Sequence, residues 1–431
     1  MEYISIIILV VVFVSLMALG VPIAWSLGLS GFLTLLVTVA TVPSATTIAQ
    51  RMGTGLDSFA LLAIPFFILA GEIMNKGGIA NRLINLAKAM TGKLPGGLLY
   101  VNVIASMLFG AIAGSAVAAA SAIGGILGPR MEKEGYPREL GASVNITAST
   151  TGLIIPPSNI LIVYSLASGG VSIAALFIAG YIPGIFIGLL LMGTAAFFIR
   201  KHNLPAGETT SWGELASKFI SAFPSLLLLI IVIGGIVLGV FTATEASAIA
   251  VVYTLGLSFF YKELKIFDVP KILLKSAETT SIVMLLIATS MSMSWVMSSE
   301  DSPQSISTAL LALSDNKFVI LILINLILLF VGLFMDMTPA VLIFTPIFLP
   351  VVTALGIDPV HFGIIMVLNL CIGVCTPPVG SVLFIGVGVA KTSIAKVFLP
   401  LLPFFIAMVV GLIILTLFPQ MTLWLPSLFD L

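Results

Sequence analysis

The sequence has few charged residues and almost no cysteine. Only 8% of its 431 residues are charged and 59% are hydrophobic, whereas about a quarter of the residues of a soluble domain are charged. The mean hydropathy is +1.24. This composition excludes a soluble enzyme, a nucleic-acid-binding protein and a disordered chain. The 18 basic and 18 acidic residues cancel, so net charge favours neither acidic nor basic partners.

The residues that usually carry enzyme chemistry are also missing. Cys371 and Cys375 lie four positions apart in one apolar run. They form no disulfide framework or metal-ligand cluster, and we expect them to be small buried residues of a helix. An intramembrane aspartyl protease needs two carboxylates, but the apolar runs offer one clear candidate, Asp336. The sequence therefore favours a membrane protein that is not an enzyme, either a transporter or a channel.

Long apolar runs are abundant and predict membrane-spanning helices. A span needs about 20 apolar residues, and a closed barrel would instead need short strands of alternating polarity. The fold class is therefore an all-α polytopic membrane protein. The predicted spans are 4–19, 21–40, 57–74, 141–168, 172–199, 223–240, 242–260, 278–298, 361–390 and 397–418. The first lacks a basic leader, so we expect it to be retained rather than cleaved.

The few basic residues are concentrated between the spans. Sixteen of the 18 lysines and arginines lie in five islands, at 76–93, 130–138, 200–218, 262–275 and 391–396. Short loops rich in basic residues face the cytoplasm. If all five islands do so, both chain termini lie on the periplasmic side.

Two further apolar runs, 94–128 and 318–350, behave differently. The first begins and ends at basic islands, so it must leave the cytoplasmic face and return to it. As one helix it would be about 52 Å long, too long for one crossing. It therefore predicts a re-entrant helical hairpin whose tip is buried in protein. The second is bounded by acidic residues and predicts a hairpin opening from the opposite side. Two tight conventional spans in each run are the alternative.

The two halves of the chain also repeat at an offset of 221 residues. Nine identities fall between positions 129 and 177 and their counterparts, including Gly152 with Gly373 and the pair Pro156-Pro157 with Pro377-Pro378. Matches at glycine and proline indicate shared backbone geometry. Because the hairpins open from opposite sides, the repeats are predicted to be inverted. This pattern is typical of secondary transporters with a site near the membrane midplane.

Each Pro-Pro pair should break a helix, because two adjacent prolines remove two backbone donors. The freed carbonyls, including those of Gly152, Ile155, Gly373 and Thr376, could point into a cavity and bind a hard cation such as Na⁺. The half-helices beyond each break would offer N-terminal amides to a carboxylate. An ordinary proline kink is the alternative.

Asp336 is an acidic residue at the expected tip of the second hairpin. An acidic side chain at mid-membrane costs about 2.5–3.5 kcal/mol, so we expect it to contribute to a cation site or a gate; a buried cap within the hairpin turn is the alternative. Its repeat counterpart is Ser115. Glu245 is expected to cap the start of its span behind Thr242 and Thr244; pairing across an interface is the alternative.

These features divide the chain into scaffold and transport segments. Segments 76–93 and 205–222 alternate charged and apolar residues and predict amphipathic helices at the membrane surface. The predicted division is N-terminal scaffold spans 1–74, an amphipathic arm 75–93, first transport repeat 94–199, arm and scaffold spans 200–298, and second transport repeat 318–418, with hairpins 94–128 and 318–350 and broken helices 141–168 and 361–390.

Several motifs together resemble one known family, the large membrane subunit of tripartite ATP-independent periplasmic (TRAP) transporters. They are IPFFILAGEIM (64–74), GSAVAAASAIG (114–124), IPPSN (155–159), TPPVG (376–380), FTATEA (241–246) and GLFMDMTPA (332–340). The resemblance extends over essentially the whole chain.

The resemblance implies an elevator-type transporter of the ion-transporter superfamily kind, in the bacterial inner membrane. It implies Na⁺-coupled import of a small organic acid, such as a C4-dicarboxylate or sialic acid, without ATP and without a cofactor beyond Na⁺ itself. The implied partners are a periplasmic substrate-binding protein and a small four-span membrane subunit encoded as a separate chain. A stand-alone dicarboxylate or anion carrier with a related inverted-hairpin fold is the alternative.

The resemblance also implies which positions bind ligands. One Na⁺ site would use Ser115, Gly152, Ile155 and Pro157, and its counterpart Asp336, Gly373, Thr376 and Pro378. The substrate would lie between the hairpin tips, near Ser158, Asn159, Gly380 and Ser381. The repeats contain no basic residue at these positions, so a carboxylate would be held by amides and hydroxyls.

Overall fold

The computed structural model describes residues 2–91, 94–202, 204–205, 211–314, 316–377 and 380–431. All the elements of these residues are helices, which confirms the all-α prediction. In chain order they are α1 (Glu2–Ala18), α2 (Ile23–Thr38), α3 (Thr41–Leu56), η1 (Phe59–Leu62), α4 (Ala63–Lys76), α5 (Ile79–Thr91), α6 (Gly97–Ala113), α7 (Ala116–Lys133), α8 (Arg138–Ile154), α9 (Asn159–Ala167), α10 (Ile173–His202), α11 (Trp212–Val237), α12 (Ala243–Phe260), η2 (Ile266–Asp268), α13 (Val269–Ser299), α14 (Ser302–Leu311), α15 (Lys317–Gly332), α16 (Met337–Ala354), α17 (Pro359–Gly373), α18 (Ser381–Val389), α19 (Ile394–Leu417) and α20 (Gln420–Ser427).

Seven helical segments within the described residues are long and apolar enough to cross a membrane, and the bent pair α8–α9 makes an eighth. The chain is therefore a multi-pass membrane protein. Several predicted spans correspond to shorter apolar helices instead, among them α2 and α17. Helix α3 was not predicted, because its threonine, serine and glutamine residues fall outside the apolar runs.

Two predicted span boundaries are absent. The amphipathic segment predicted at 205–222 and the span predicted at 223–240 share one helix, α11, and the span predicted at 278–298 begins earlier, because α13 starts at Val269. The physical reason is that charged residues mark where a helix meets water, whereas a helix ends only where its backbone hydrogen bonds are interrupted. The arm predicted at 75–93 contains the amphipathic helix α5.

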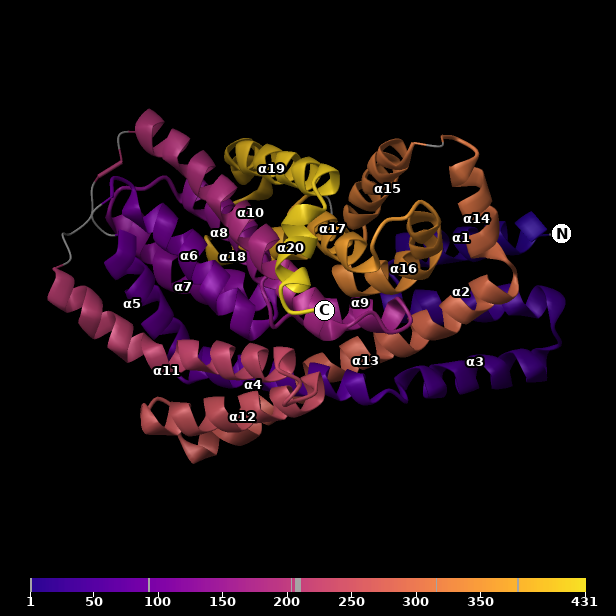
Figure 1. The fold of residues 1–431 in the computed structure, drawn as a ribbon, viewed down its shortest axis with the longest axis horizontal. Coiled ribbons are helices and arrows are strands. Elements are labelled where there is room, and N and C mark those ends of the chain that lie inside the picture. The colour runs from indigo at the N-terminus through magenta and orange to yellow at the C-terminus, as the bar shows by residue number, and fades with distance from the viewer. Residues whose placement is uncertain (1, 92–93, 203, 206–210, 315, 378–379) are drawn as a thin grey trace.

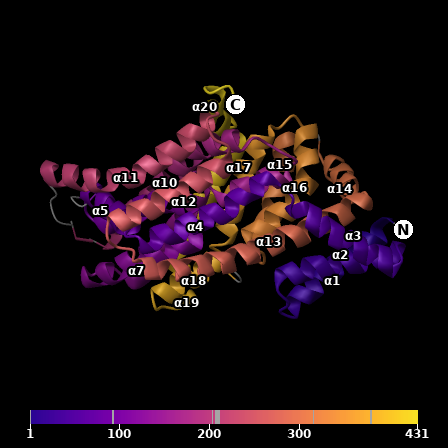
Figure 2. The same ribbon diagram turned by 90° about the horizontal axis from the view of Figure 1, so that it is seen from below.

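Helices α4, α11, α12 and α13 form a layer along one side of the molecule (Figure 1; Figure 2). An ion pair fixes part of this layer, because Lys275 Nζ on α13 lies 3.1 Å from Glu72 Oε1 on α4. Helix α12 begins with a capping box in which Thr242 and Glu245 exchange hydrogen bonds. This geometry confirms the capping role predicted for Glu245.

The remaining core consists of two series of five helices with the same order. The first is α6 to α10 and the second is α15 to α19. Shifting α7 by 221 residues reproduces the bounds of α16 at both ends. The repeat predicted from isolated prolines and glycines is thus a repeat of whole secondary-structure elements.

The two series interlock. The second helix of each hairpin packs against the short helix that follows the break in the other series: α7 packs on α18, and α16 packs on α9. Helices α8 and α17 also contact each other, and α10 and α19 flank them. Neither series therefore forms a separate body, and each break lies beside a hairpin of the other repeat.

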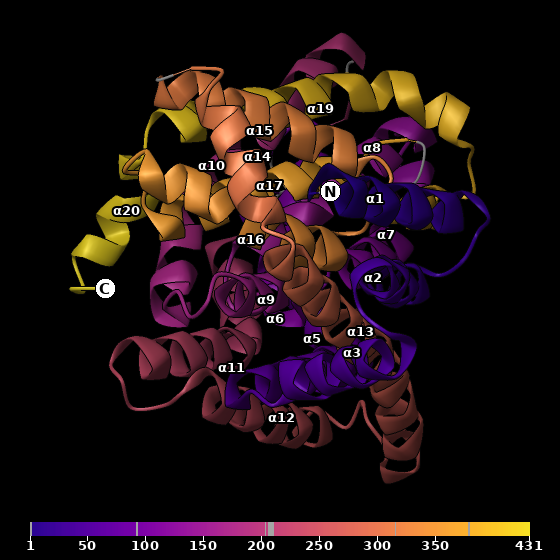
Figure 3. The same ribbon diagram turned by 90° about the vertical axis from the view of Figure 1, so that its right-hand side faces the viewer.

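The predicted hairpins are present as packed helix pairs. Helices α6 and α7 contact each other across the turn at Gly114 and Ser115, and α15 and α16 do so across residues 333–336. Their depth in the bilayer and their entry from opposite sides stay predictions. The two chain termini lie well apart (Figure 3).

Candidate functional site

Both hairpin tips end in the same local structure. Ser115 is the N-cap residue of α7, and its Oγ accepts a hydrogen bond from the Ala118 amide at 3.2 Å. Asp336 is the N-cap residue of α16, and its Oδ1 accepts from the Met337 amide at 3.0 Å. The two positions are 221 residues apart. Each tip therefore places an oxygen-bearing side chain at the positive end of a helix.

The first Pro-Pro break has the predicted form. Helix α8 ends at Ile154, α9 begins at Asn159, and the two meet at a bend of 51°. Pro156 and Pro157 lack the N–H groups that would have bonded the carbonyls of Gly152 and Leu153. The Leu153 carbonyl accepts instead from Ser158 Oγ.

The tip of the first hairpin lies against this break. Gly114 has a positive φ of 60°, and a Cβ there would lie 3.1 Å from Asn159 Nδ2. The Asn159 Oδ1 atom is buried and has no hydrogen-bond partner among the described residues. The N-termini of α7 and α9 therefore adjoin, with an acceptor oxygen at their junction.

The second break differs from the prediction in its carbonyls, two of which already accept backbone hydrogen bonds. The Gly373 carbonyl accepts from the Thr376 amide at 2.9 Å, and the Thr376 carbonyl accepts from the Gly380 amide at 3.1 Å. These two carbonyls are therefore not left without a donor, although each oxygen retains a second lone pair. Pro378, predicted to belong to this cation site, lies outside the described residues.

Asp336 joins the second tip to the second break. Ser381 Oγ, at the start of α18, donates to Asp336 Oδ1 at 3.4 Å. The Asp336 side chain is exposed, and within the described parts of the chain its Oδ2 receives no hydrogen bond. Asp336 thus caps the hairpin turn, but as an exposed residue and not as the buried cap given as the alternative, and it still has a free carboxylate oxygen. Its role in a cation site stays a prediction.

The predicted residues belong to two clusters, each joined by one contact between hairpin tip and break, at Gly114–Asn159 and at Asp336–Ser381. The first cluster consists of Ser115 at the hairpin tip and the break residues Gly152, Ile155, Pro157, Ser158 and Asn159; the second of Asp336 and the break residues Gly373, Thr376, Gly380 and Ser381. In the first cluster, Pro157 lines a small cavity together with Phe67 of α4 and Leu228 of α11. Its ring therefore faces the layer formed by α4, α11, α12 and α13.

Four asparagines within the helices of the two repeats were not predicted. Asn102 Nδ2 on α6 donates to Asn145 Oδ1 on α8 at 3.4 Å, and Asn369 Nδ2 on α17 donates to Asn325 Oδ1 on α15 at 3.0 Å. Each pair ties the first helix of a hairpin to the helix before the break. Isolated amides within apolar runs were the available signal, because a buried amide needs a partner.

Two glycine contacts bring the same helices together. A Cβ on Gly152 would lie 2.2 Å from Gly110 Cα, and a Cβ on Gly373 would lie 2.6 Å from Gly332 Cα. No side chain fits at either crossing. Gly152 and Gly373, predicted as ligand residues, thus have a packing role that the structure shows directly.

Two interlocked helical repeats, each with a capped hairpin tip beside a broken helix, define a membrane transporter with repeat symmetry. The solved structure of a transporter from Alcanivorax borkumensis, YdaH, shares this fold. It matches 88% of this chain and 89% of its own length at a TM-score of 0.66 and 14% sequence identity.

Sequence comparisons identify the family of transporters to which the chain belongs. Residues 10–421 match the model of the tripartite ATP-independent periplasmic transporter, DctM component. The chain is 55% identical over 429 residues to the uncharacterized protein YgiK of Salmonella typhimurium, covering 99% of both chains. It is 39% identical to the C4-dicarboxylate TRAP transporter large permease protein DctM of Rhodobacter capsulatus, covering 96% of this chain and 97% of that one. The chain belongs to the DctM family of TRAP transporter large permease proteins.

Proposed function

We propose that this chain is the Na⁺-coupled, substrate-translocating subunit of an importer for a small organic acid in the bacterial inner membrane. The observation that supports this most is the Asp336–Ser381 contact. It places a carboxylate with one free oxygen at the junction of a hairpin tip and a broken helix. Na⁺ prefers oxygen ligands, and this junction offers carboxylate, hydroxyl and carbonyl oxygens.

In this proposal the two clusters are pseudo-symmetric Na⁺ sites. Ser115, Gly152, Ile155 and Pro157 would form the first, and Asp336, Gly373 and Thr376 the second. Because the Gly373 and Thr376 carbonyls already accept one hydrogen bond each, they would bind Na⁺ through the remaining lone pair. The Asp336 carboxylate would supply the charge that Na⁺ needs.

The organic acid would bind between the tips. Asn159 and Ser381 begin α9 and α18, where the positive end of the helix dipole favours a carboxylate. At the start of α18 the amides of Val382 and Leu383 already donate to the Val374 carbonyl, so the dipole and the Ser381 hydroxyl would act there. Ser158 and Gly380 immediately precede these helices. This arrangement would hold an anion without a lysine or arginine at the predicted substrate positions. Relatives named for C4-dicarboxylates and for sialic acid support the class of substrate.

The transport movement in this proposal is an elevator. The interlocked repeats α6–α10 and α15–α19 would move together against the layer of α4, α11, α12 and α13, with α5 as a connecting arm. The contacts of α5 with both α6 and α11 support this assignment.

Two partners complete the proposed importer. A periplasmic binding protein would deliver the acid, and a small membrane subunit would accompany this chain. An isethionate TRAP transporter permease protein DctMQ from Oleidesulfovibrio alaskensis supports the second partner, because the match covers 96% of this chain but only 65% of that protein. The additional length there has room for a fused subunit.

Reconstitution in liposomes tests the proposal. Radiolabelled succinate and sialic acid are supplied with an inward Na⁺ gradient, with and without a cognate binding protein and small subunit. We expect uptake of one acid only when all three proteins and Na⁺ are present. Uptake by this chain alone would instead support a stand-alone anion carrier, and uptake that does not saturate would indicate a channel.

A further inference from the structure

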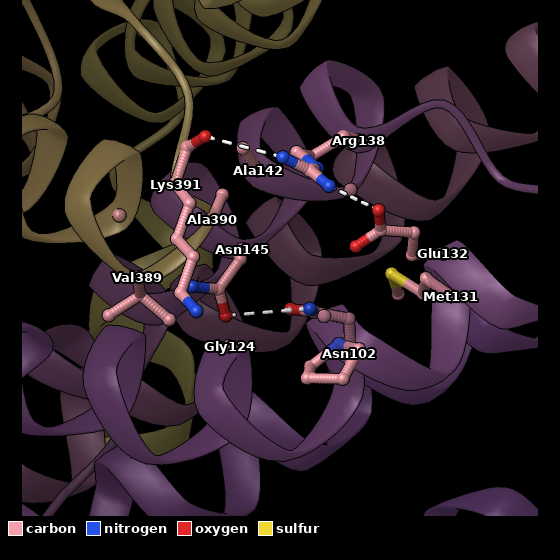
Figure 4. Close-up of a pocket in the computed structure, with 14 residues that line it drawn as sticks. Asn102, Gly124, Met131, Glu132, Arg138, Ala142, Asn145, Val389, Ala390 and Lys391 are labelled. Atoms are coloured by element: carbon pink, nitrogen blue, oxygen red, sulfur yellow. Dashed lines mark hydrogen bonds and ion pairs between the residues drawn. The ribbon is translucent and has the colours of Figure 1, made fainter.

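A cavity lies at the opposite end of α18 from Ser381. Its volume is about 200 Å³, far above the ~10–15 Å³ that one water requires. It forms where the first repeat meets the end of α18, a helix of the second repeat (Figure 4). Its lining residues are Asn102, Gly124, Gly128, Pro129, Met131, Glu132, Arg138, Gly141, Ala142, Asn145, Gly386, Val389, Ala390 and Lys391.

The rim of this cavity carries excess positive charge. Arg138 and Lys391 are its cations and Glu132 is its only acidic residue. Arg138 forms an ion pair with Glu132, and its Nη1 also donates to the Lys391 carbonyl at 3.4 Å. The ammonium of Lys391 has no ion-pair partner among the described residues, so one positive charge is left unbalanced.

The floor of the cavity consists of amides that retain donors. Asn102 is 1% exposed and Asn145 is 3% exposed. Asn102 Nδ2 donates to Asn145 Oδ1, and Asn145 Nδ2 donates to the Ala120 carbonyl at 2.8 Å. Each amide nitrogen carries two hydrogens, so one N–H on each has no acceptor in these contacts. The unused groups are donors, which suit an anion.

Lys391 has an unusual backbone conformation. Its φ of 51° is left-handed. The Lys391 amide donates a hydrogen bond to the Gly388 carbonyl, and the Thr392 amide donates one to the Val387 carbonyl. This pair of hydrogen bonds is the Schellman motif that ends a helix. Glycine is favoured at this position because a Cβ is strained there. Here a lysine takes it, and its side chain extends toward Asn145 (Figure 4).

Two glycines of α7 keep the space open. A Cβ on Gly124 would lie 2.4 Å from Asn145 Nδ2, so any side chain there would displace the amide. A Cβ on Gly128 would have no atom within 4 Å. Gly128 therefore borders the open space directly.

We propose that this cavity binds an oxyanion, a carboxylate or a phosphate group, between Lys391, Arg138 and the amides of Asn102 and Asn145. The site is separate from the hairpin tips, since Ser381 and Lys391 are about 15 Å apart along α18. This proposal depends on the cavity alone and does not depend on the proposed Na⁺-coupled transport. An anion there contacts both repeats and holds α7 against α18. The same group could come from a free organic acid, from inorganic phosphate or from a lipid headgroup.

Protection of an introduced cysteine tests this site. Gly128→Cys is labelled with a maleimide in neutral detergent and Na⁺-free buffer, with succinate or inorganic phosphate added. The native Cys371 and Cys375 are buried and give a low background in the wild-type protein. We expect either anion to slow labelling of Gly128→Cys and to leave Gly125→Cys, on the exposed face of α7, unchanged.

Charge variants and lipid composition complete the experiment. Lys391→Gln should raise the half-protecting concentration about tenfold, because it removes a hydrogen bond to a charged group, whereas Lys396→Gln should not change it. Protection only in nanodiscs containing phosphatidylglycerol, and not phosphatidylethanolamine, would assign the oxyanion to lipid. Equal protection in Lys391→Gln, or none under any condition, would overturn the proposal. If Gly128→Cys does not fold, thermal unfolding replaces the labelling experiment. The same anions should then raise the unfolding temperature of the wild type and leave that of Lys391→Gln unchanged.

Discussion

The sulfhydryl of Cys371 donates to the backbone carbonyl of Thr150, with Sγ and oxygen 3.5 Å apart. These residues are separated by 221 positions, the interval of the internal repeat. Residues at equivalent positions of two symmetry-related repeats can touch only near the symmetry axis that relates the repeats. The helices that precede the two breaks therefore cross at this axis, which places the Pro-Pro breaks in the middle of the paired repeats.

The relation between the repeats predicts opposite labelling of equivalent residues. Lys133 ends α7 and Ala354, 221 positions later, ends α16. If the repeats are inverted in the membrane, cysteines at these positions face opposite sides. In intact cells a membrane-impermeant maleimide should label Ala354→Cys and spare Lys133→Cys, and inside-out vesicles should show the reverse. Labelling of both from one side would exclude inversion.

The glycine crossings predict a steep loss of stability on substitution. Gly152→Ala and Gly373→Ala each force a methyl group into a neighbouring backbone, and overpacking costs on the order of 1–3 kcal/mol. We expect a lower thermal unfolding temperature in detergent for both. Gly256→Ala, whose Cβ meets no atom within 4 Å, is the matched control. Unfolding temperatures equal to that of this control would contradict the crossing geometry.

The buried amide pair of the second repeat predicts a non-additive effect. Asn369→Leu removes the Asn369 Nδ2 donor from both the backbone oxygen and the Oδ1 atom of Asn325, and an unsatisfied buried polar group costs about 1–3 kcal/mol. The double variant with Asn325→Leu removes both amides and should lose less stability than the sum of the single variants. Thermal unfolding of the three variants measures this difference. Additive losses would show that the two amides do not stabilise each other.

The sequence predicted the breaks and the repeat because proline and glycine act locally. Pro156 and Pro157 lack N–H groups wherever they stand, so the end of α8 could be placed closely. The hairpin ends predicted from the charges, at 128 and 350, fall short of the helix ends, since α7 continues to Lys133 and α16 to Ala354. Helix α11 was misjudged because a change from charged to apolar residues does not interrupt backbone hydrogen bonds.

The site was predicted less completely than the fold. Asp336 stood out as an acidic residue within an apolar run, but its contact with Ser381 joins positions 45 apart and carries no local signal. The Gly110–Gly152 crossing and the Asn102–Asn145 pair likewise depend on how α6 packs against α8. The cavity of the further inference combines Arg138 and Lys391, which belong to two basic islands that no sequence pattern pairs.

The most direct test of the central claim is equilibrium binding of radioactive ²²Na⁺ to the purified protein. Asp336 and Asp358 both cap helices through Oδ1, so Asp336→Asn and Asp358→Asn form a matched pair. We predict saturable Na⁺ binding that Asp336→Asn sharply weakens and Asp358→Asn preserves. Equal binding by the two variants, or no saturable binding by the wild type, would contradict a cation site at the second hairpin tip.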